Sequence, residues 1–249
     1  MKNIIIILST LVSLSILSAH CDGCGTKTEH SHGTLKGNVK YEGKTPKPRS
    51  LKMDADPVCG AAHEGKVLSE SFIVDEKSNL KNVLVWLKDV KYDGPLPKEP
   101  AILDQKGCVY SPHVLGVMKN QKVIIKNSDA TLHNIHSMAE KNDQFNFAMP
   151  KVVKEKGTIF TEVEEPFYIK CDVHPWMKSW VLVQDHPYFA VTDEKGNFII
   201  ENIPPGKYEV IAWQEKFKMK RSITKTIVIK DSSETTQDFT FIKPTAPKK

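Results

Sequence analysis

The sequence predicts an all-β fold made of two modules. Gly, Pro, Asn and Asp punctuate the 249-residue chain, and the short runs between them are rich in Val, Ile, Phe and Tyr. This composition is typical of many short strands and little helix. The length leaves room for one or two domains with an ample core. The pattern changes near residues 185–187, and we place the boundary between the modules there.

Residues 1–20 are expected to be a signal peptide and to lie outside the fold. Lys2 gives a positive start, and only Ser and Thr interrupt the apolar run from Ile4 to Leu17, which is too short for a comfortable membrane span. Cleavage can follow Ala19. Alternatively, Cys21 becomes the lipidated first residue of a lipoprotein. We therefore expect a periplasmic or extracellular protein whose one route to the membrane is a lipid anchor.

Export to an oxidising compartment affects which roles the cysteines can have. Residues 21–33 contain Cys21, Cys24 and two histidines, and they are expected to be a flexible Cys/His-rich tether, with metal capture as the alternative. In an oxidising compartment, Cys59 and Cys108 are expected to form a disulfide. Two buried free thiols are the alternative for that pair.

The first module is expected to span residues 34–185. Its strand candidates alternate apolar and polar residues or form short apolar runs. They are residues 35–41, 71–74, 83–87, 114–117, 121–126, 158–163, 166–171 and 180–184. Residues 140–156 lack a clear period and are expected to be a long irregular connection.

The second module is expected to span residues 186–243. Turns rich in Gly, Pro, Asn and Asp separate its apolar runs. The expected strands are residues 189–192, 198–200, 208–213, 222–230 and 238–242. The tail at 244–249 is expected to be disordered.

The charge of the chain argues against one class of partner. The formal net charge is +5, and the lysines are spread along the sequence without an arginine-rich stripe. Nucleic-acid binding is therefore a poor interpretation.

One heptapeptide carries most of the functional information. Cys171, His174 and Met177 follow the spacing C-x2-H-x2-M, and His133 ends a segment that follows a predicted strand. Two His, one Cys and a weak axial Met are the ligand set of a blue copper electron-transfer site. The sequence therefore predicts one copper ion held by these four residues. Asn134 can hydrogen-bond to the loop and hold it in place.

Other residues compete with this interpretation. A lone His is usually a surface side chain and a lone Met is usually core, so only the spaced triplet indicates a metal site. His136 competes with His133, and His113 is a candidate polar neighbour, whereas His63 and His186 look like loop residues. Zinc is disfavoured because the folded region has no second Cys/His pair at zinc-like spacing and Met is a poor zinc ligand.

Residues 101–184 resemble the cupredoxin family, namely its amicyanin-like and plastocyanin-like type 1 copper proteins. The resemblance rests on the loop at 171–177, with Pro175 after the His, and on the His-Asn-x-His segment at 133–136. It implies a Greek-key β-sandwich and a type 1 copper site in which the first His of that segment, His133, is the ligand. The chain departs from the family in its size, in its extra sequence before residue 80 and in two cysteines.

The second module resembles the carboxypeptidase-regulatory-like or transthyretin-like family. The match lies at residues 192–198 and 203–208, where a Gly turn and a Pro-Pro-Gly turn join successive strands. It implies a second, smaller β-sandwich and says little about function. In an alternative arrangement, residues 34–41 and 83–87 are the early strands of this module, and the cupredoxin is an insertion in it.

The expected function is that of an exported one-electron carrier and not of an enzyme. Four protein ligands leave no open position for a substrate. The edge of His174, with Trp176 beside it, is expected to be the electron port to a redox partner such as a cytochrome or an oxidoreductase. Lys170 and Lys178 can steer an acidic partner, or they can be ordinary solvated surface.

Two other functions compete with the carrier. The Cys/His leader and the appended sandwich also fit a copper-handling or interaction module of the cell envelope. An oxidase would need a second, open metal site with several histidines. The chain has nine His, and the folded region has no His-x-His pair.

Overall fold

A computed structural model describes residues 32–217 and 222–242, and it confirms the all-β prediction. Within those residues the only helix is the short α1 (Pro57–Ala61). No helix in this part of the chain is long and apolar enough to cross a membrane. The predicted signal peptide, Cys21 with nearly all of the tether, and the tail at 244–249 lie outside the described residues.

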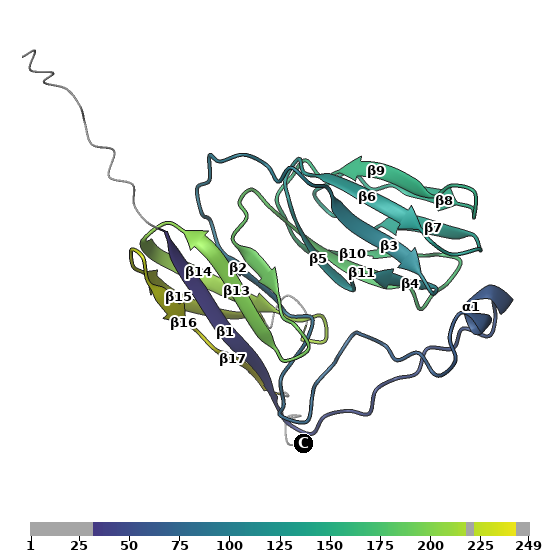
Figure 1. The fold of residues 1–249 in the computed structure, drawn as a ribbon, viewed down its shortest axis with the longest axis horizontal. Helices are drawn as coiled ribbons and strands as arrows, with labels where there is room; N and C mark the ends of the chain where they lie inside the picture. Colours follow the sequence, from purple (N-terminus) through teal and green to yellow (C-terminus); the bar gives the residue numbers. More distant parts are fainter. Residues whose placement is uncertain (1–31, 218–221, 243–249) are drawn as a thin grey trace, which may run out of the picture.

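Strands from the two ends of the described chain form one β-sandwich, which we call the terminal sandwich (Figure 1). One sheet has the order β13-β1-β16, with β17 also pairing with β1, and the other has the order β12-β2-β14-β15. These strands are β1 (Gly33–Glu42), β2 (Leu84–Leu87), β12 (Phe189–Val191), β13 (Asn197–Ile203), β14 (Gly206–Trp213), β15 (Ile223–Ile229), β16 (Glu234–Thr236) and β17 (Phe239–Ile242).

The chain between β2 and β12 forms a second β-sandwich, the inserted sandwich (Figure 1). Its sheets have the orders β4-β3-β6-β9 and β5-β11-β10-β7-β8. Its strands are β3 (Ala101–Lys106), β4 (Val109–Ser111), β5 (Val114–Met118), β6 (Lys122–Asn127), β7 (His133–Ser137), β8 (Asn146–Met149), β9 (Glu155–Ile159), β10 (Glu164–Lys170) and β11 (Lys178–Gln184). The pairing of β1 with β13 and of β2 with β12 and β14 is the inserted arrangement considered above, so the early strands belong to the terminal sandwich.

Strand β2 joins the two sandwiches because both of its faces are buried. Val85 and Leu87 lie in the core of the terminal sandwich, whereas Leu84 and Trp86 pack on the other side against β5 and β11, including Leu182. Successive side chains of a strand point to opposite faces. The continuous apolar run of β2 is therefore explained by a core on one side and an interface between sandwiches on the other.

The connection from β1 to β2 contains a segment that we call the cover, residues 49–69. Its two ends pair with each other, because Leu51 N–H donates to the Val67 carbonyl and Ser69 N–H donates to the Arg49 carbonyl, both at 2.8 Å. Figure 1 shows the connection running out from the terminal sandwich to α1, which lies near the β4 end of the inserted sandwich.

Helix α1 is held at the middle of the cover. Asp56 is its N-cap and accepts from the Val58 N–H at 2.8 Å and from the Cys59 N–H at 3.3 Å, and a proline follows the cap. Cys59 forms a disulfide with Cys108, which lies in the tight turn between β3 and β4. The disulfide ties the cover to the inserted sandwich.

Several strand predictions differ from the structure. Residues 71–74 form no strand, because Val74 makes only an isolated bridge with Leu80. Phe72 is partly buried against the core of the terminal sandwich. The predicted irregular connection at 140–156 contains β8, which pairs with β7. Strands β3 and β4 were not predicted, because polar Asp, Gln and Lys side chains follow their apolar residues, and β9 lies earlier than residues 158–163.

Candidate metal centre

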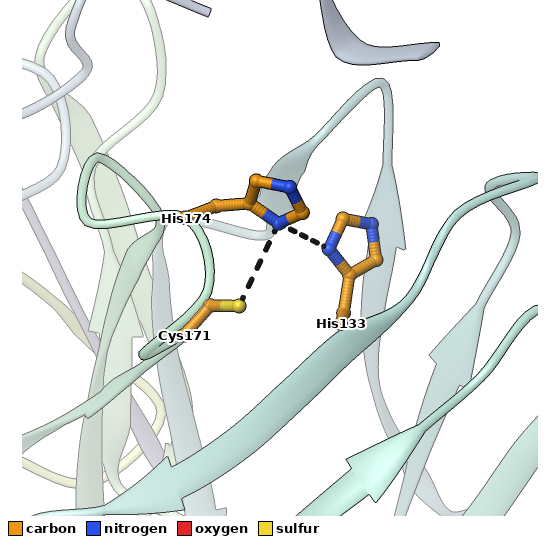
Figure 2. A group of neighbouring side chains, drawn as sticks. All are labelled: His133, Cys171 and His174. Carbon is orange, nitrogen blue, oxygen red and sulfur yellow. Dashed lines mark hydrogen bonds between the residues drawn. The ribbon is translucent and has the colours of Figure 1, made fainter. Parts of the chain in front are cut away.

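Two neighbouring strands bring three predicted ligands to one end of the inserted sandwich. His133 is the first residue of β7, and Cys171 directly follows β10, which pairs with β7. His174 lies in the loop that leads from Cys171 to β11. Figure 2 shows the three side chains pointing toward one another. All three are buried, with exposed fractions of 0% to 2%.

The distances among these side chains fit a shared metal ion. His133 Nδ1 lies 2.9 Å from His174 Nδ1, and Cys171 Sγ lies 3.7 Å from His174 Nδ1 (Figure 2). Nitrogen and sulfur ligands about 2.0–2.3 Å from one tetrahedral ion lie about 3.5 Å apart, and two nitrogens lie about 3.3 Å apart. The S···N separation matches, and the two nitrogens are slightly closer than an ion requires. The donor set therefore fits a thiophilic metal with a small opening of the rings.

Met177 closes the loop that carries these ligands. Its N–H donates to the His174 carbonyl at 2.9 Å, and its carbonyl accepts from the Cys171 N–H at 3.3 Å. Its side chain is buried in the same apolar cluster as Cys171. The structure thus places Met177 in the loop that carries the ligands, and its role as the fourth ligand stays a prediction.

Asn134 holds the ligand loop against β7. Its Oδ1 accepts from the Asp172 N–H at 2.6 Å and from the Val173 N–H at 3.4 Å. Its backbone N–H donates to Cys171 Sγ at 3.4 Å. The role expected for Asn134 from the sequence matches these contacts, and the N–H contact additionally supplies a donor to the sulfur.

Two carboxylates orient the imidazoles, and sequence reasoning missed both. Asp129 Oδ2 lies 2.8 Å from His133 Nε2, and Asp56 Oδ2 lies 3.0 Å from His174 Nε2. A metal-binding His commonly donates its second ring N–H to a carboxylate, which fixes the tautomer. Both rings are therefore held with Nδ1 directed toward Cys171. Asp129 precedes His133 by four residues and was a local signal, whereas Asp56 comes from the distant cover.

The charges at the site agree with this arrangement. Burial opposes protonation of His133, but its hydrogen bonds to Asp129 and its proximity to Cys171 raise its pKa to about 9. Burial likewise opposes ionisation of Cys171, yet hydrogen bonds from His133 and from backbone N–H groups lower the pKa of the thiol. His133 is thus an imidazolium at neutral pH, and it lies beside a thiol that ionises more readily than usual.

Asp56 is ionised even though it is partly covered. Partial burial opposes ionisation, but hydrogen bonds from His174, Thr131 and the first N–H groups of α1 outweigh it and lower the pKa of Asp56 to about 2. Asp56 is therefore a carboxylate at neutral pH, and it can accept a hydrogen bond from the Nε2 proton of His174.

The predicted electron port at His174 needs correction. His174 is 2% exposed, and its Nε2 contacts Asp56 and lies 3.6 Å from Cys59 Sγ. The cover therefore lies over the ring edge that was expected to face solvent. Trp176 is half-buried and donates from Nε1 to the backbone carbonyl of the disulfide-bonded Cys108 at 2.9 Å.

The other histidines lie outside the group of three. His136 points away from it, because residues three apart in a strand lie on opposite faces, and its Nδ1 contacts Asp172 at 2.8 Å. His113 faces Glu215 at the junction of the sandwiches, 3.4 Å away. His63 contacts the Gly107 carbonyl, and His186 is buried against the N–H of a nearby tyrosine.

The lysines considered for steering differ in their surroundings. Lys170 Nζ lies 2.8 Å from Asp172, so its charge is paired, and the pKa of Lys170 is raised by that contact. Lys178 is exposed, and its Nζ lies 4.5 Å from the centroid of the Tyr168 ring.

Comparisons with known proteins give partial matches. Residues 163–237 match the family model for polysaccharide lyase family 4, domain II. The match runs from β10 in the inserted sandwich through β16 in the terminal sandwich. It supports a β-sandwich in this region, and the carboxypeptidase-regulatory-like family stays a prediction. No curated protein matches the chain in sequence.

Several solved structures of copper proteins are similar to part of the chain. A copper-containing nitrite reductase from Thermus scotoductus SA-01 is 18% identical with a TM-score of 0.33, and the match covers 39% of this chain but only 25% of the reductase. A methionine-to-alanine mutant of amicyanin in its Cu(I) form is 20% identical with a TM-score of 0.31, covering 40% of this chain and 98% of amicyanin. A purple cupredoxin from Nitrosopumilus maritimus is 24% identical with a TM-score of 0.29, covering 34% of this chain and 99% of that protein.

Proposed function

We propose that this protein binds one copper ion in a type 1 site and carries single electrons between redox partners. The observation that carries the proposal is the buried convergence of two imidazole Nδ1 atoms and one thiol Sγ on a shared position. The ion would be held by His133, Cys171 and His174, with Met177 as the fourth ligand. Such a set leaves no open position for a substrate, so we propose no catalytic turnover.

The choice of copper follows from the donor set. Soft thiolate and thioether ligands suit Cu(I), imidazoles suit Cu(II), and a site that offers both is a compromise between the two oxidation states. When bound, copper supplies the one-electron couple. The chain contributes a thiol whose pKa is lowered and two rings whose Nδ1 atoms face it.

The surroundings of the ligands favour a site that rearranges little. Asp129 and Asp56 fix the two rings through Nε2, and Asn134 fixes the loop through two backbone N–H groups. Ligands locked by such contacts hold their geometry in both oxidation states. Burial of the group also excludes water from the metal position.

Because the cover blocks His174, the proposed route for electrons passes through Trp176. The Trp176 ring centroid lies 5.1 Å from that of His174, and the neighbouring Pro175 is exposed. A redox partner protein, such as a cytochrome or an oxidoreductase, would dock on this face. Lys178 remains available for steering, whereas Lys170 is already paired with Asp172.

The proposed setting is the periplasm or the extracellular space, with a lipid anchor at Cys21 as one form of attachment. The disulfide between Cys59 and Cys108 supports an oxidising compartment, because structural disulfides persist there.

The experiment that tests carrier function is voltammetry of the copper-loaded protein. A carrier gives a reversible one-electron wave through many cycles and keeps its metal. The alternative is copper handling, in which the ion is passed on; a competing chelator would then remove Cu(I) within the duration of a few cycles. An irreversible wave with loss of copper would reject the carrier and favour the handler.

A further inference from the structure

The disulfide lies against the Nε2 edges of the rings of His133 and His174. We call this the outer side of the rings, and the Nδ1 side that faces Cys171 the inner side. Each ring presents Nδ1 to Cys171 and Nε2 to a second group of potential ligands. One outer group is Asp56, Cys59 and His174, and the other is Cys108, Asp129 and His133, with the ligand atoms of each group within 4.8 Å of one another. The two groups meet at the bond between Cys59 and Cys108.

The geometry on the outer side resembles that on the inner side. Cys59 Sγ lies 3.6 Å from His174 Nε2, while Cys171 Sγ lies 3.7 Å from His174 Nδ1. Both values match the spacing of about 3.5 Å expected for nitrogen and sulfur on one tetrahedral ion. Asp129 is fixed beside the other sulfur, because its Oδ2 accepts from the Cys108 N–H at 2.8 Å.

The disulfide sulfurs are poor ligands until the bond is reduced. A dithiol reductant can supply two electrons and two protons, which break the S–S bond, give two thiols and leave the reductant as its own disulfide. Loss of the thiol protons then yields thiolates, which are the metal-binding form. The freed groups are two thiolates and two imidazole Nε2 atoms, all at positions buried to within 2%. Two Cys and two His are a ligand set of the kind that zinc prefers. They form two separate groups in the oxidised protein, so one ion joins them only when the freed sulfurs move apart and the rings follow.

We propose that reduction of the Cys59–Cys108 disulfide creates a second metal site on the outer side of His133 and His174. Its occupant is a single thiophilic ion of the Zn(II) or Cu(I) class, for which thiolate and imidazole ligands are suited. In the oxidised protein, Asp56 and Asp129 contact the two Nε2 atoms. When an ion binds there, each carboxylate either gives up this contact or becomes a ligand of the ion.

The second site competes with the first. Both sites draw on the same two rings, through Nδ1 on the inner side and Nε2 on the outer side, so an ion on one side constrains the rings that the other site needs. The thiol state of the cover thereby sets which side of the two rings binds metal. Oxidised protein favours the inner site with Cys171, and reduced protein gains the outer one.

Cobalt(II) is the probe, because its thiolate complexes absorb in the near ultraviolet and visible. The test protein is the full chain with Cys21→Ser, Cys24→Ser and Cys171→Ser, in which Cys59 and Cys108 are the only cysteines left. One sample keeps the disulfide. The other is reduced with a phosphine and then freed of reductant without oxygen. The matched control adds Cys59→Ser and Cys108→Ser to the same background.

The expected result is a thiolate-to-cobalt absorption that saturates at about one equivalent in the reduced sample. It is absent from the oxidised sample and from the control, and Zn(II) displaces it. Reduced protein that keeps its β-type circular dichroism without this absorption would overturn the proposal. Unfolding upon reduction would overturn it too, because the site requires a folded reduced chain. All samples lack Cys171, so the outcome is independent of the proposed type 1 site.

Discussion

The terminal sandwich encloses an apolar core that extends from Leu35 to Phe241, whereas the inserted sandwich buries an imidazole pair, a thiol and several amides in its own core region. The first arrangement is stabilised mainly by apolar burial, and its few buried polar groups, such as Thr192, are hydrogen-bonded to the backbone. The second must satisfy each buried polar group with a partner, and the contacts of His133 and Asn134 do so. The comparison separates a scaffold from a site, although both are β-sandwiches.

The largest expected effect is on stability, from a substitution in the core of the terminal sandwich. Leu35 in β1 is fully buried, so Leu35→Ala should lower the free energy of unfolding by about 2–5 kcal/mol, measured by urea denaturation. Ile199 is 55% exposed, and Ile199→Ala is the control, with a change below about 0.5 kcal/mol. The visible spectrum of the copper-loaded folded protein should not change in either variant. A spectral change in Leu35→Ala would show that the two sandwiches are not separable in this way.

The second prediction concerns pH. His133 has a raised pKa of about 9, so below that pH copper must displace its proton. Copper affinity should therefore fall as pH falls, by about tenfold per unit for that one proton between pH 8 and 6. Competition with a chelator of known affinity measures this dependence. An affinity that is independent of pH across this range would contradict the imidazolium assigned to the metal-free site.

The third prediction concerns the contact that holds the loop. Asn134→Ala removes the acceptor of two loop N–H groups, so copper affinity should fall by about 10–100-fold. Asn197→Ala, an exposed position in the terminal sandwich, should leave the affinity unchanged. Equal affinities in the two variants would mean that the loop is rigid without Asn134.

The smallest expected effect tests the cover. Asp56→Asn removes a negative charge from His174 Nε2, which weakens ring donation and favours Cu(I). The reduction potential should rise by up to about 59 mV, equivalent to a tenfold change in relative affinity for the two oxidation states. Asn can still cap α1, so the cover should keep its helix. Asp54→Asn, exposed and two residues away, is the control, and a fall in potential for Asp56→Asn would contradict the account.

Local sequence patterns predicted the candidate ligands but not the residues that surround them. The spacing of Cys171 and His174 and the position of His133 after a strand are local patterns, and they identified the three groups that the structure brings together. Asp56 lies 118 residues from His174 in the chain, so no periodicity or spacing connects them. The contact with Asp56 also buries His174. The sequence prediction of an exposed His174 edge was wrong because it could not include this distant residue.

The fold shows the same division between local and distant information. Strands with clear alternation, such as β1 and β11, were predicted within a few residues. Membership in a sandwich depends on pairing between distant strands, as for β1 with β13, and the sequence left two arrangements open. Residues 71–74 have strand composition, but they lack a neighbour that pairs along their length.

The most direct test of the central claim is a Cu(II) titration of the whole chain and of its Cys171→Ser variant, followed by visible and EPR spectroscopy. A type 1 site should give an intense blue colour and a narrow copper hyperfine splitting at saturation, both lost in the variant. A colourless protein, or ordinary tetragonal copper that is the same with and without the Cys171 thiol, would contradict the type 1 site.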